Sequence, residues 1–497
     1  MMNRRRYLAL LAGGTAGLAG CGGRSPDEPE PETPQPTSTP ETATPDVAES
    51  FDRVVDVVDD LGCDPTGESP CDRTIAEAAS SNTLFRFPAG RYQFADGIAV
   101  DGYSRLGFVG EGKVRLVPPE GFNHWLLDVD VGEFLIDNFD IDIRQSDVNA
   151  GIRAITETGF RIENVEHVGR GTHSAPYEVD ALVPVVKDPS GVGIVRNYVA
   201  KKGSAWGHYG NGRTGIYIGR LNRGTIRVVD CQFEEFGGAG IYATATQGNV
   251  QVVGGTFRNN NVASIRLGGD GSYVDGARIE IDLDQYTGPR TQEQNAFRLR
   301  GIIINQKSAY IAKPGGAEIR NCSIHILKAP SPGPAIAVMG PARESTIRDT
   351  EIRVDTPDTP AIHRFGRVPF EKHPPSEDPR WIRLENVRIA GKASGRAAVI
   401  VEGAPGSILR GCDIVQTGEG RDGIHIVASG NCVLDGGSVV ASRYPVVVDP
   451  GPGGSDGECY VDIQNAPKLT SRTEDTAEVR LADGTVLPCL QSVQNSR

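Results

Sequence analysis

The sequence predicts an all-β fold, a right-handed parallel β-helix in which a single chain winds into a solenoid behind a short N-terminal helical cap. A short strand phrase occurs three times, and its middle residues Tyr217, Tyr242 and Arg266 are spaced 25 and 24 residues apart (242 − 217 and 266 − 242). A period in the twenties indicates a stack of similar coils. The composition agrees, because 62 Gly and only 6% aromatic residues favour short strands and many turns.

A second recurring motif carries Asn, Asp or Gly at its third position. These residue types tolerate the left-handed backbone of a tight corner, so we expect one corner of each coil at this position. The predicted corner residues are Asn138, Asn164, Asn197, Asp230, Gly254, Gly276, Asn321, Asp349, Asn386, Gly411 and Gly436. Neither the leucine spacing of a leucine-rich repeat nor the period of a hexapeptide helix occurs, which favours the parallel β-helix.

The first 50 residues indicate export. Arg4, Arg5 and Arg6 precede an apolar run that ends at Leu18-Ala19-Gly20-Cys21, and the run is shorter than the about 20 residues of a membrane-spanning helix. This pattern resembles a twin-arginine (Tat) lipoprotein signal, which implies a signal peptide over residues 1–20 and a lipid anchor on Cys21. An ordinary cleaved signal peptide is the alternative. The Pro-, Glu- and Thr-rich residues 21–50 predict a disordered tether, and the expected location is the outer face of the cytoplasmic membrane or the cell surface.

Residues 51–116 predict an N-terminal cap and the first rungs. Asp72 is expected to N-cap a short helix that continues to Ala79. The order of a strand, an Asp-Pro-Thr-Gly turn at 64–67, this helix and the Phe-Pro-x-Gly-x-Tyr motif at 87–92 resembles the entry segment of the pectate-lyase-like superfamily, which includes polygalacturonases. The segment 60–63 departs from the aromatic-Gly-Ala that is usual there. The resemblance implies sugar-acid chemistry along an outward strand face, by hydrolysis or by β-elimination.

The remaining chain predicts the β-helix over residues 117–470 and a C-terminal hairpin cap over residues 471–497, with a turn at Asp483-Gly484. Long gaps between corner residues indicate inserted loops. Such loops stack on one face of a solenoid and commonly wall its binding groove. The expected insertions span residues 169–190, 201–214, 285–295 and 366–380.

Charge and cysteines narrow the class of protein. A net charge of −13 disfavours binding to nucleic acid. The acidic, lysine-poor composition is typical of halophilic proteins, although a GC-rich genome gives the same bias. Besides Cys21, the pairs Cys63–Cys71 and Cys459–Cys489 are candidate disulfides. Cys231, Cys322 and Cys412 share one position of the repeat and are expected to be buried, and none of the cysteines has the spacing of a zinc site.

The middle residues of successive strands are expected to point outward and to form one column. Tyrosine rings offer flat faces for sugar rings, and arginine side chains match carboxylates or sulfates with two hydrogen bonds. Outward Tyr and Arg also occur on exposed sheets for β-propensity and solubility alone, which is the alternative. The predicted column is Arg153, Tyr217, Tyr242, Arg266, Arg298, Ala337, His363, Ile400, His425 and Val447.

A glycine-rich loop just before Tyr217 adds binding candidates, because exposed aromatic and basic residues on such loops are more often used for binding than for packing. The loop candidates are Trp206, His208, Tyr209, Asn211 and Arg213. A second possible wall of the groove contains His173, Tyr177, Glu178 and Asp180.

The same residues suggest a reaction. Hydrolysis needs two facing carboxylates, but Asp270 is the only acid that the sequence places beside the column, and the polygalacturonase motifs are not intact. Elimination needs a cation for the uronate carboxylate and a base for the adjacent C–H. We therefore expect Arg266 to neutralise and Tyr217 or His208 to take the proton. Arg298 is an alternative cation, and Tyr242 is an alternative base. Substrate binding is expected from Tyr242, Arg298, Trp206, Tyr209, Asn211, Arg213 and Asp270.

The sequence thus predicts an exported β-helix protein that binds and cleaves uronate-containing polysaccharide, with elimination favoured over hydrolysis. The alternative is a non-catalytic glycan-binding adhesin or envelope protein. No cofactor is expected, although alternating acids such as Glu280, Asp282 and Asp284, or Asp140 and Asp142, are a possible Ca²⁺ site or simply a solvated flank. The oligomeric state is left open.

Overall fold

The structure is a computed structural model that describes residues 50–172, 179–206, 212–289, 299–305, 315–330, 332–366, 379–449, 461–465, 467–471, 478–481 and 486–488. The chain divides into two units, Met1–Asp46 and Val47–Arg497, and the description below concerns the second. The domain limits expected from the sequence remain predictions.

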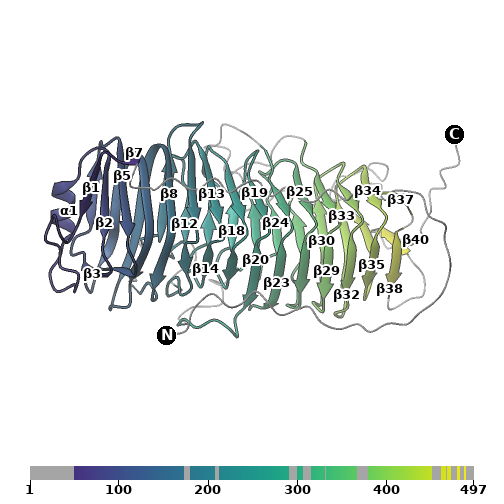
Figure 1. The fold of residues 1–497 in the computed structure, drawn as a ribbon. Coiled ribbons are helices and arrows are strands. Elements are labelled where there is room, and N and C mark those ends of the chain that lie inside the picture. The colour runs from purple at the N-terminus through teal and green to yellow at the C-terminus, as the bar shows by residue number, and fades with distance from the viewer. Residues whose placement is uncertain are drawn as a thin grey trace, which may run out of the picture. The chain divides into compact units, whose positions relative to one another are not determined.

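The second unit is a right-handed parallel β-helix of about 14 turns, as the sequence predicts. Successive turns lie side by side along the solenoid (Figure 1). Each turn contributes one strand to each of three faces, and strands of the same face pair in parallel from one turn to the next. Two long strands, β7 (Asn123–Asp142) and β8 (Asn149–Val168), cross all three faces without interruption.

The first face is built from β4 (Ile98–Asp101), β9 (Leu182–Val186), β12 (Ile216–Tyr217), β15 (Ile241–Tyr242), β18 (Ile265–Leu267), β21 (Ile302–Ile304), β24 (Ile336–Val338), β27 (Ile362–Arg364), β30 (Ala397–Glu402), β33 (Asp422–Val427), β36 (Val446–Asp449) and β39 (Glu478–Leu481). The second face is built from β1 (Arg53–Asp56), β2 (Thr83–Phe87), β5 (Arg105–Gly110), β10 (Val192–Arg196), β13 (Thr225–Val229), β16 (Val250–Val253), β19 (Tyr273–Asp275), β22 (Glu318–Arg320), β25 (Ser345–Arg348), β28 (Ile382–Glu385), β31 (Ile408–Arg410), β34 (Cys432–Asp435) and β37 (Val461–Gln464). The third face is built from β3 (Gly90–Gln93), β6 (Val114–Val117), β11 (Val199–Ala200), β14 (Gln232–Glu234), β17 (Thr256–Arg258), β20 (Arg278–Asp282), β23 (Ser323–Lys328), β26 (Glu351–Val354), β29 (Arg388–Gly391), β32 (Asp413–Gln416), β35 (Ser438–Ala441) and β38 (Lys468–Ser471).

The corner between the second and third faces confirms the motif found in the sequence. All eleven predicted corner residues have a left-handed backbone, with φ between +48° (Asp349) and +73° (Gly276). Asn and Asp adopt this region at lower cost than other side-chain-bearing residues. The corner amides also bond from turn to turn, since Asn197 Nδ2 donates to Asn164 Oδ1 at 2.8 Å and Asn164 Nδ2 donates to Asp137 Oδ1 at 2.6 Å.

The interior is a stack of aliphatic side chains in register. On the first face, Ile216 pairs with Ile241, Ile241 with Ile265 and Ile265 with Ile302, and all four are fully buried. Each such side chain contributes about 1.5–3 kcal/mol when it leaves water. Cys231, Cys322 and Cys412 are buried in the wall, as predicted.

The N-terminal end is covered by α1 (Asp72–Ala78), whose Ile75 packs into the core. The expected N-cap role of Asp72 is wrong, because Cys71 holds that position without a side-chain cap. The Asp72 carboxylate instead accepts hydrogen bonds from the backbone N–H groups of Asp96 (2.7 Å) and Gly97 (2.8 Å). These two N–H groups belong to the next turn, so the carboxylate fastens the helix to the solenoid.

At the opposite end, β40 (Val486–Pro488) pairs antiparallel with β39. Every other strand pairing of the described segments is parallel. No helix within the described ranges is long and apolar enough to cross a membrane.

Candidate functional site

The outward column of the first face exists, with one change. Tyr217 pairs with Tyr242, Tyr242 with Arg266 and Arg266 with Ile303. The prediction that Arg298 follows Arg266 is therefore wrong, because the residues inserted before β21 place Ile303 in that register, and Arg298 lies outside the described residues. Further along, the column continues through Ala337, His363, Ile400, His425 and Val447 as predicted. Before Tyr217, Val183 stands between Arg153 and the tyrosine strand, a rung that the sequence analysis missed.

Tyr217, Tyr242 and Arg266 form a continuous stack, which we call the tyrosine–arginine ladder. The two rings stack with centroids 5.5 Å apart and planes 24° apart. The Arg266 guanidinium carbon lies 4.8 Å from the centre of the Tyr242 ring, a cation–π geometry. Tyr217 is 37% exposed, so one end of the stack is open to solvent.

Arg266 has no carboxylate partner among the described residues, and its Nε is buried without a hydrogen bond. Most outward arginines of this acidic protein are paired. Arg153 Nε lies 2.6 Å from Asp128 Oδ1, Arg258 Nη2 lies 2.7 Å from Glu280 Oε1, and Arg320 Nε lies 2.9 Å from Asp275 Oδ2. The ladder therefore ends in a guanidinium whose charge is not neutralised by an ion pair within the described part of the chain.

The electrostatics of the ladder suit an anion. Burial, followed by the neighbouring Tyr242 hydroxyl, raises the pKa of Tyr217, so its phenol stays protonated at neutral pH. The exposed Arg220, three residues along the chain, has a smaller opposite effect on this pKa. A raised pKa makes Tyr217 a hydrogen-bond donor and stacking surface and disfavours it as a base.

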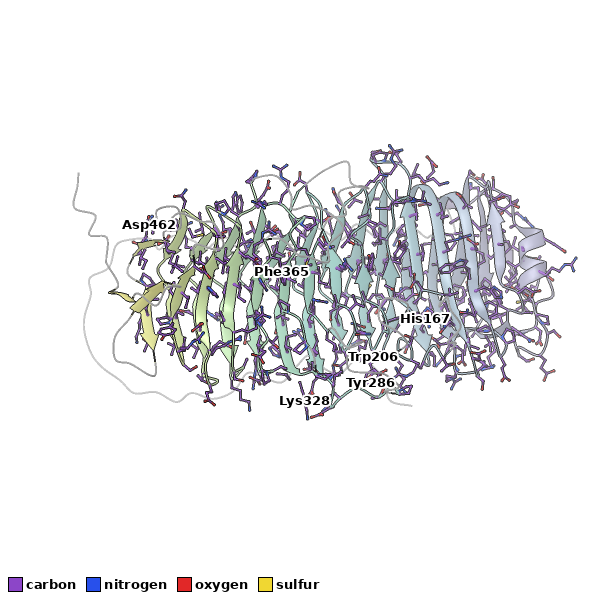
Figure 2. All side chains as sticks on the ribbon, turned by 180° about the vertical axis from the view of Figure 1, so that it is seen from behind. His167, Trp206, Tyr286, Lys328, Phe365 and Asp462 are labelled. Carbon is purple, nitrogen blue, oxygen red and sulfur yellow. The ribbon has the colours of Figure 1, made fainter. Side chains whose placement is uncertain are left out.

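Trp206 is not an exposed loop residue, which corrects the sequence analysis. Its side chain is 1% exposed and packs against Tyr286, with ring centroids 4.4 Å apart (Figure 2). Because a large apolar ring gains more by burial than by exposure, glycine neighbours alone do not predict an exposed tryptophan. Trp206 therefore helps to anchor an inserted segment on the solenoid and presents no surface to a ligand.

Arg213 is also buried, at 1% exposure, contrary to the expected binding role. Its Nη2 donates to the Ala150 carbonyl at 2.5 Å and lies 3.3 Å from His167 Nδ1. His167 Nε2 in turn lies 2.6 Å from the Tyr198 hydroxyl, and the half-buried Asp180 accepts a hydrogen bond from the Thr214 backbone N–H at 2.8 Å. These residues form a buried polar cluster inside the coil, where the guanidinium satisfies main-chain carbonyl groups.

The other candidates have varied outcomes. Asp270 is exposed just beyond β18 and makes no ion pair with Arg266. The proposed roles of several residues fall outside the described part of the chain, namely Cys21, His173, Tyr177, Glu178, His208, Tyr209, Asn211, Cys459 and Cys489. Cys63 and Cys71 are both buried and free, and the hydrogen bond that the Cys71 thiol donates to Cys63 is the largest cause of the raised pKa of Cys71. Their disulfide stays a prediction that this proximity permits.

Four of the five alternating acids, all except Asp282, are paired with basic side chains of the described segments. Asp140 Oδ2 lies 3.2 Å from Arg115 Nη2, and Asp284 Oδ2 lies 2.7 Å from Lys328 Nζ. In the described ranges, no three His, Cys, Asp or Glu side chains gather as metal ligands. Charge neutralisation along the solenoid therefore accounts for these acids.

The sequence analysis missed a second outward row. Glu402 and Asp449 lie two residues beyond the column residues Ile400 and Val447 on the same strands. The two-residue alternation of a strand could have identified them, because residues i and i + 2 share a face. Both residues line a pocket together with His363 and His425.

No family model matches the chain, and no curated protein matches it. Similar solved structures include a Streptococcus pneumoniae surface protein and adhesin (11% identity, 86% of this chain and 99% of that chain, TM-score 0.47). A mannuronan C-5 epimerase A-module from Azotobacter vinelandii matches with 13% identity over 84% of this chain and 99% of that chain, with a TM-score of 0.39. The catalytic unit of a thermostable α-1,3-glucanase from Streptomyces thermodiastaticus matches with 11% identity, 84% and 69% coverage and a TM-score of 0.42. Identities this low transfer no activity to this chain.

Proposed function

We propose that this protein binds anionic, uronate-containing polysaccharide on the first face of its solenoid, through the tyrosine–arginine ladder. The observation that carries the proposal is the Arg266 guanidinium, which pairs with no described carboxylate and ends the stack of Tyr217 and Tyr242. A planar guanidinium matches a carboxylate with two parallel hydrogen bonds, and the aromatic faces match sugar rings. Together they fit a chain of sugars that bears carboxylates.

The rest of the molecule supports an anionic ligand rather than a neutral one. The protein carries a net charge of −13, so it attracts an anionic ligand only where positive charge is concentrated locally, as at Arg266. With acids available throughout the sequence, a guanidinium that meets none of the described carboxylates is a costly arrangement unless a ligand supplies the negative charge.

We further propose the finer assignments from the sequence. The protein is exported by the signal over residues 1–20, is anchored through a lipid on Cys21, and cleaves its ligand by β-elimination rather than by hydrolysis. Arg266 binds a carboxylate of the uronate chain, while Tyr217 and Tyr242 hold its sugar rings. The raised pKa of Tyr217 disfavours it as the base, so His208 or a group elsewhere on the face must take the proton.

The first test is binding of alginate and polygalacturonate compared with a neutral dextran, measured by affinity electrophoresis or calorimetry. We expect Arg266→Ala to weaken binding of the uronates about tenfold or more, since hydrogen bonds to charged groups contribute about 1.5–3 kcal/mol. Wild-type binding should also weaken as NaCl rises, because salt screens the charge.

Arg227→Ala is the matched control, because Arg227 is an exposed arginine on β13 of the second face whose side chain bonds to Gln251 and to no other described residue. Equal uronate binding by wild type and Arg266→Ala would reject the ladder as the binding site.

A non-catalytic glycan-binding adhesin is the second candidate. It is favoured by the surroundings of Arg266, where no described histidine or carboxylate contacts the guanidinium. Absorbance of unsaturated uronates during incubation with alginate and pectate separates the two, since an adhesin binds without producing this signal.

A further inference from the structure

A second cluster of polar side chains lies on the same face, three turns and more beyond the tyrosine–arginine ladder. Between the two, the outward residues Ile303 and Ala337 are buried in an apolar cluster with Ala263, Met339 and Phe365. Because this apolar cluster interrupts the polar column, the second cluster is a separate site.

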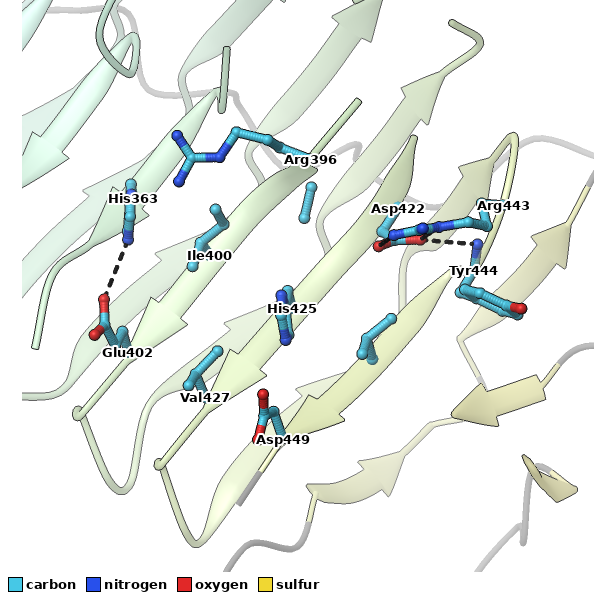
Figure 3. A pocket seen from close by; sticks show the side chains of 12 residues that line it. His363, Arg396, Ile400, Glu402, Asp422, His425, Val427, Arg443, Tyr444 and Asp449 are labelled. Atoms are coloured by element: carbon cyan, nitrogen blue, oxygen red, sulfur yellow. Dashed lines mark hydrogen bonds and ion pairs between the residues drawn. The ribbon is translucent and has the colours of Figure 1, made fainter. Parts of the chain in front are cut away.

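The cluster lines a pocket of about 580 Å³ on β27, β30, β33 and β36. His363 and His425 lie along its middle, on the outward column, with Ile400 between them. Figure 3 shows Arg396 and Arg443 on one side of this line and Glu402 and Asp449 on the other. The pocket therefore has a basic side, a row of imidazoles and an acidic side.

The imidazoles are poorly satisfied by the protein. His363 is only 5% exposed, yet neither of its ring nitrogens makes a hydrogen bond with a described residue, and Glu402 Oε2 lies 3.5 Å from its Nε2. The Nε2 of His425 is buried and has no hydrogen-bond partner in the described part of the chain either. Buried polar atoms without partners cost free energy, and a ligand in the pocket would recover it.

Arg396 is the uncompensated cation of the pocket. It is exposed and forms no ion pair with a described residue, whereas Arg443 Nε lies 2.7 Å from Asp422 Oδ1. Asp422 is thereby neutralised, and Tyr444, under the Arg443 guanidinium, adds an aromatic surface. A sugar ring can thus direct a carboxylate towards Arg396 and its hydroxyl groups towards Glu402 and Asp449.

Protonation states agree with this arrangement. Burial lowers the pKa of both His363 and His425, although Glu402 opposes the shift at His363 and Asp449 and Asp422 oppose it at His425. Both imidazoles are therefore neutral at pH 7 and able to accept a proton. The His363 imidazole lowers the pKa of Glu402, which keeps this carboxylate ionised and excludes it as the acid that hydrolysis needs.

We propose that this pocket is the centre where the bound uronate chain is cut, with His425 as the base, Arg396 as the carboxylate-binding cation and His363 held beside Glu402 to contact the sugar. This inference rests on the proposed function. The His425 imidazole takes the proton on the carbon next to the carboxylate, and the electron pair of that C–H bond forms the C4–C5 double bond. The C4–O bond breaks, its oxygen leaves with the electron pair, and the imidazolium returns the proton to it. Atoms and charge balance without a co-reactant.

The test compares wild type, His425→Gln and His425→Ala on alginate and polygalacturonate, by absorbance of unsaturated uronates. A positioned base contributes about 100-fold or more to the rate, so both variants should lose at least that factor while they bind the polymer as wild type does. Wild-type activity should rise with pH along an imidazole titration with its midpoint below 6.5. His325→Gln, a histidine on β23 of the third face, is the control and should retain full activity.

The outcomes separate the two proposals. If wild type binds uronates and its cleavage is unaffected by both His425 variants, or if it binds without cleaving, the catalytic role of the pocket is rejected and the binding function stands. If wild type binds no uronate, the proposed function itself is rejected. Far-UV circular dichroism and thermal unfolding of each variant establish that lost activity does not reflect lost folding.

Discussion

At the scale of single residues, the buried polar cluster around His167 controls how stability responds to pH. The His167 side chain is 4% exposed and contacts Tyr198 and Arg213. Burial, followed by the Arg213 charge, lowers the pKa of His167 well below its usual 6.5. The folded protein thus resists a proton that the unfolded chain accepts.

We expect the free energy of unfolding to fall as the pH drops below about 6.5, because from there the unfolded chain binds a proton at His167 that the folded state does not. In His167→Gln this contribution is absent. Below about pH 6.5, the free energy of unfolding of wild type should therefore fall relative to that of His167→Gln, by up to about 1.4 kcal/mol for each pH unit. Urea unfolding at pH 7.5 and 5.5 measures it.

Asp180→Asn is the matched control, for which the pH dependence of stability has the opposite sign. Burial raises the pKa of Asp180 to about 6, so the folded state binds a proton before the unfolded chain does, and stability from this group rises as the pH falls below 6. The variant should lose that gain and become more acid-sensitive. A pH-independent difference between wild type and His167→Gln would contradict the argument.

Residue-scale features were only partly predictable from the sequence. The outward position of Tyr217, Tyr242 and Arg266 follows from strand alternation alone, and the structure places them as expected. The burial of Trp206 and Arg213 could not be inferred, because a side chain in an inserted loop is buried or exposed according to where the loop lands. That depends on contacts distant in sequence, such as Trp206 with Tyr286.

At the scale of single elements, the corners determine the path of the chain. Asn197 combines a left-handed backbone (φ +49°) with a side-chain bond to Asn164 in the preceding turn. Both properties are local to the residue type, which explains why these eleven corners could be identified from the sequence. Arg298 was misplaced for the opposite reason, since an insertion of variable length precedes β21 and shifts the register to Ile303.

We expect Asn197→Val to destabilise the protein by about 2–3 kcal/mol, from about 1–2 kcal/mol of backbone strain and about 1 kcal/mol for the lost hydrogen bond. Asn197→Gly removes only the hydrogen bond, so it should cost about 1 kcal/mol. Denaturant midpoints of the three proteins measure the difference. If Val and Gly are equally tolerated, the left-handed corner does not govern stability at this position.

At the scale of the whole solenoid, each turn contacts mainly the turns before and after it, so stability is close to a sum over neighbours. The longest strand pairing joins β7 and β8, where Ile136 pairs with Ile162 and Asp137 with Glu163. Equivalent positions of these two strands are therefore one complete turn apart. We infer that one turn can be deleted as a unit.

We expect a variant without residues 137–162 to fold into a solenoid one turn shorter, because Ile136 is then joined to Glu163 in register. In wild type, β9 and β10 pair with β8. In the variant, they would pair with the equivalent positions of the shortened strand. Size-exclusion chromatography, far-UV circular dichroism and cooperative thermal unfolding check this.

The control variant lacks only residues 137–149, which is about half a turn. In this variant, side chains that should point into the core fall at corner positions. This variant should be unfolded or aggregated. If the half-turn variant folds as well as the full-turn variant, the solenoid is not built of equivalent coils.

The antiparallel pairing of β39 with β40 has a consequence for how copies of the protein behave towards one another. A parallel solenoid exposes, at its last coil, main-chain N–H and C=O groups that match the first coil of another molecule, and helix α1 occupies the corresponding place at the first coil. The reversal of chain direction at β40 on the first face, and the helix at the other end, remove part of this matching template. We expect both to disfavour end-to-end polymerisation into fibres.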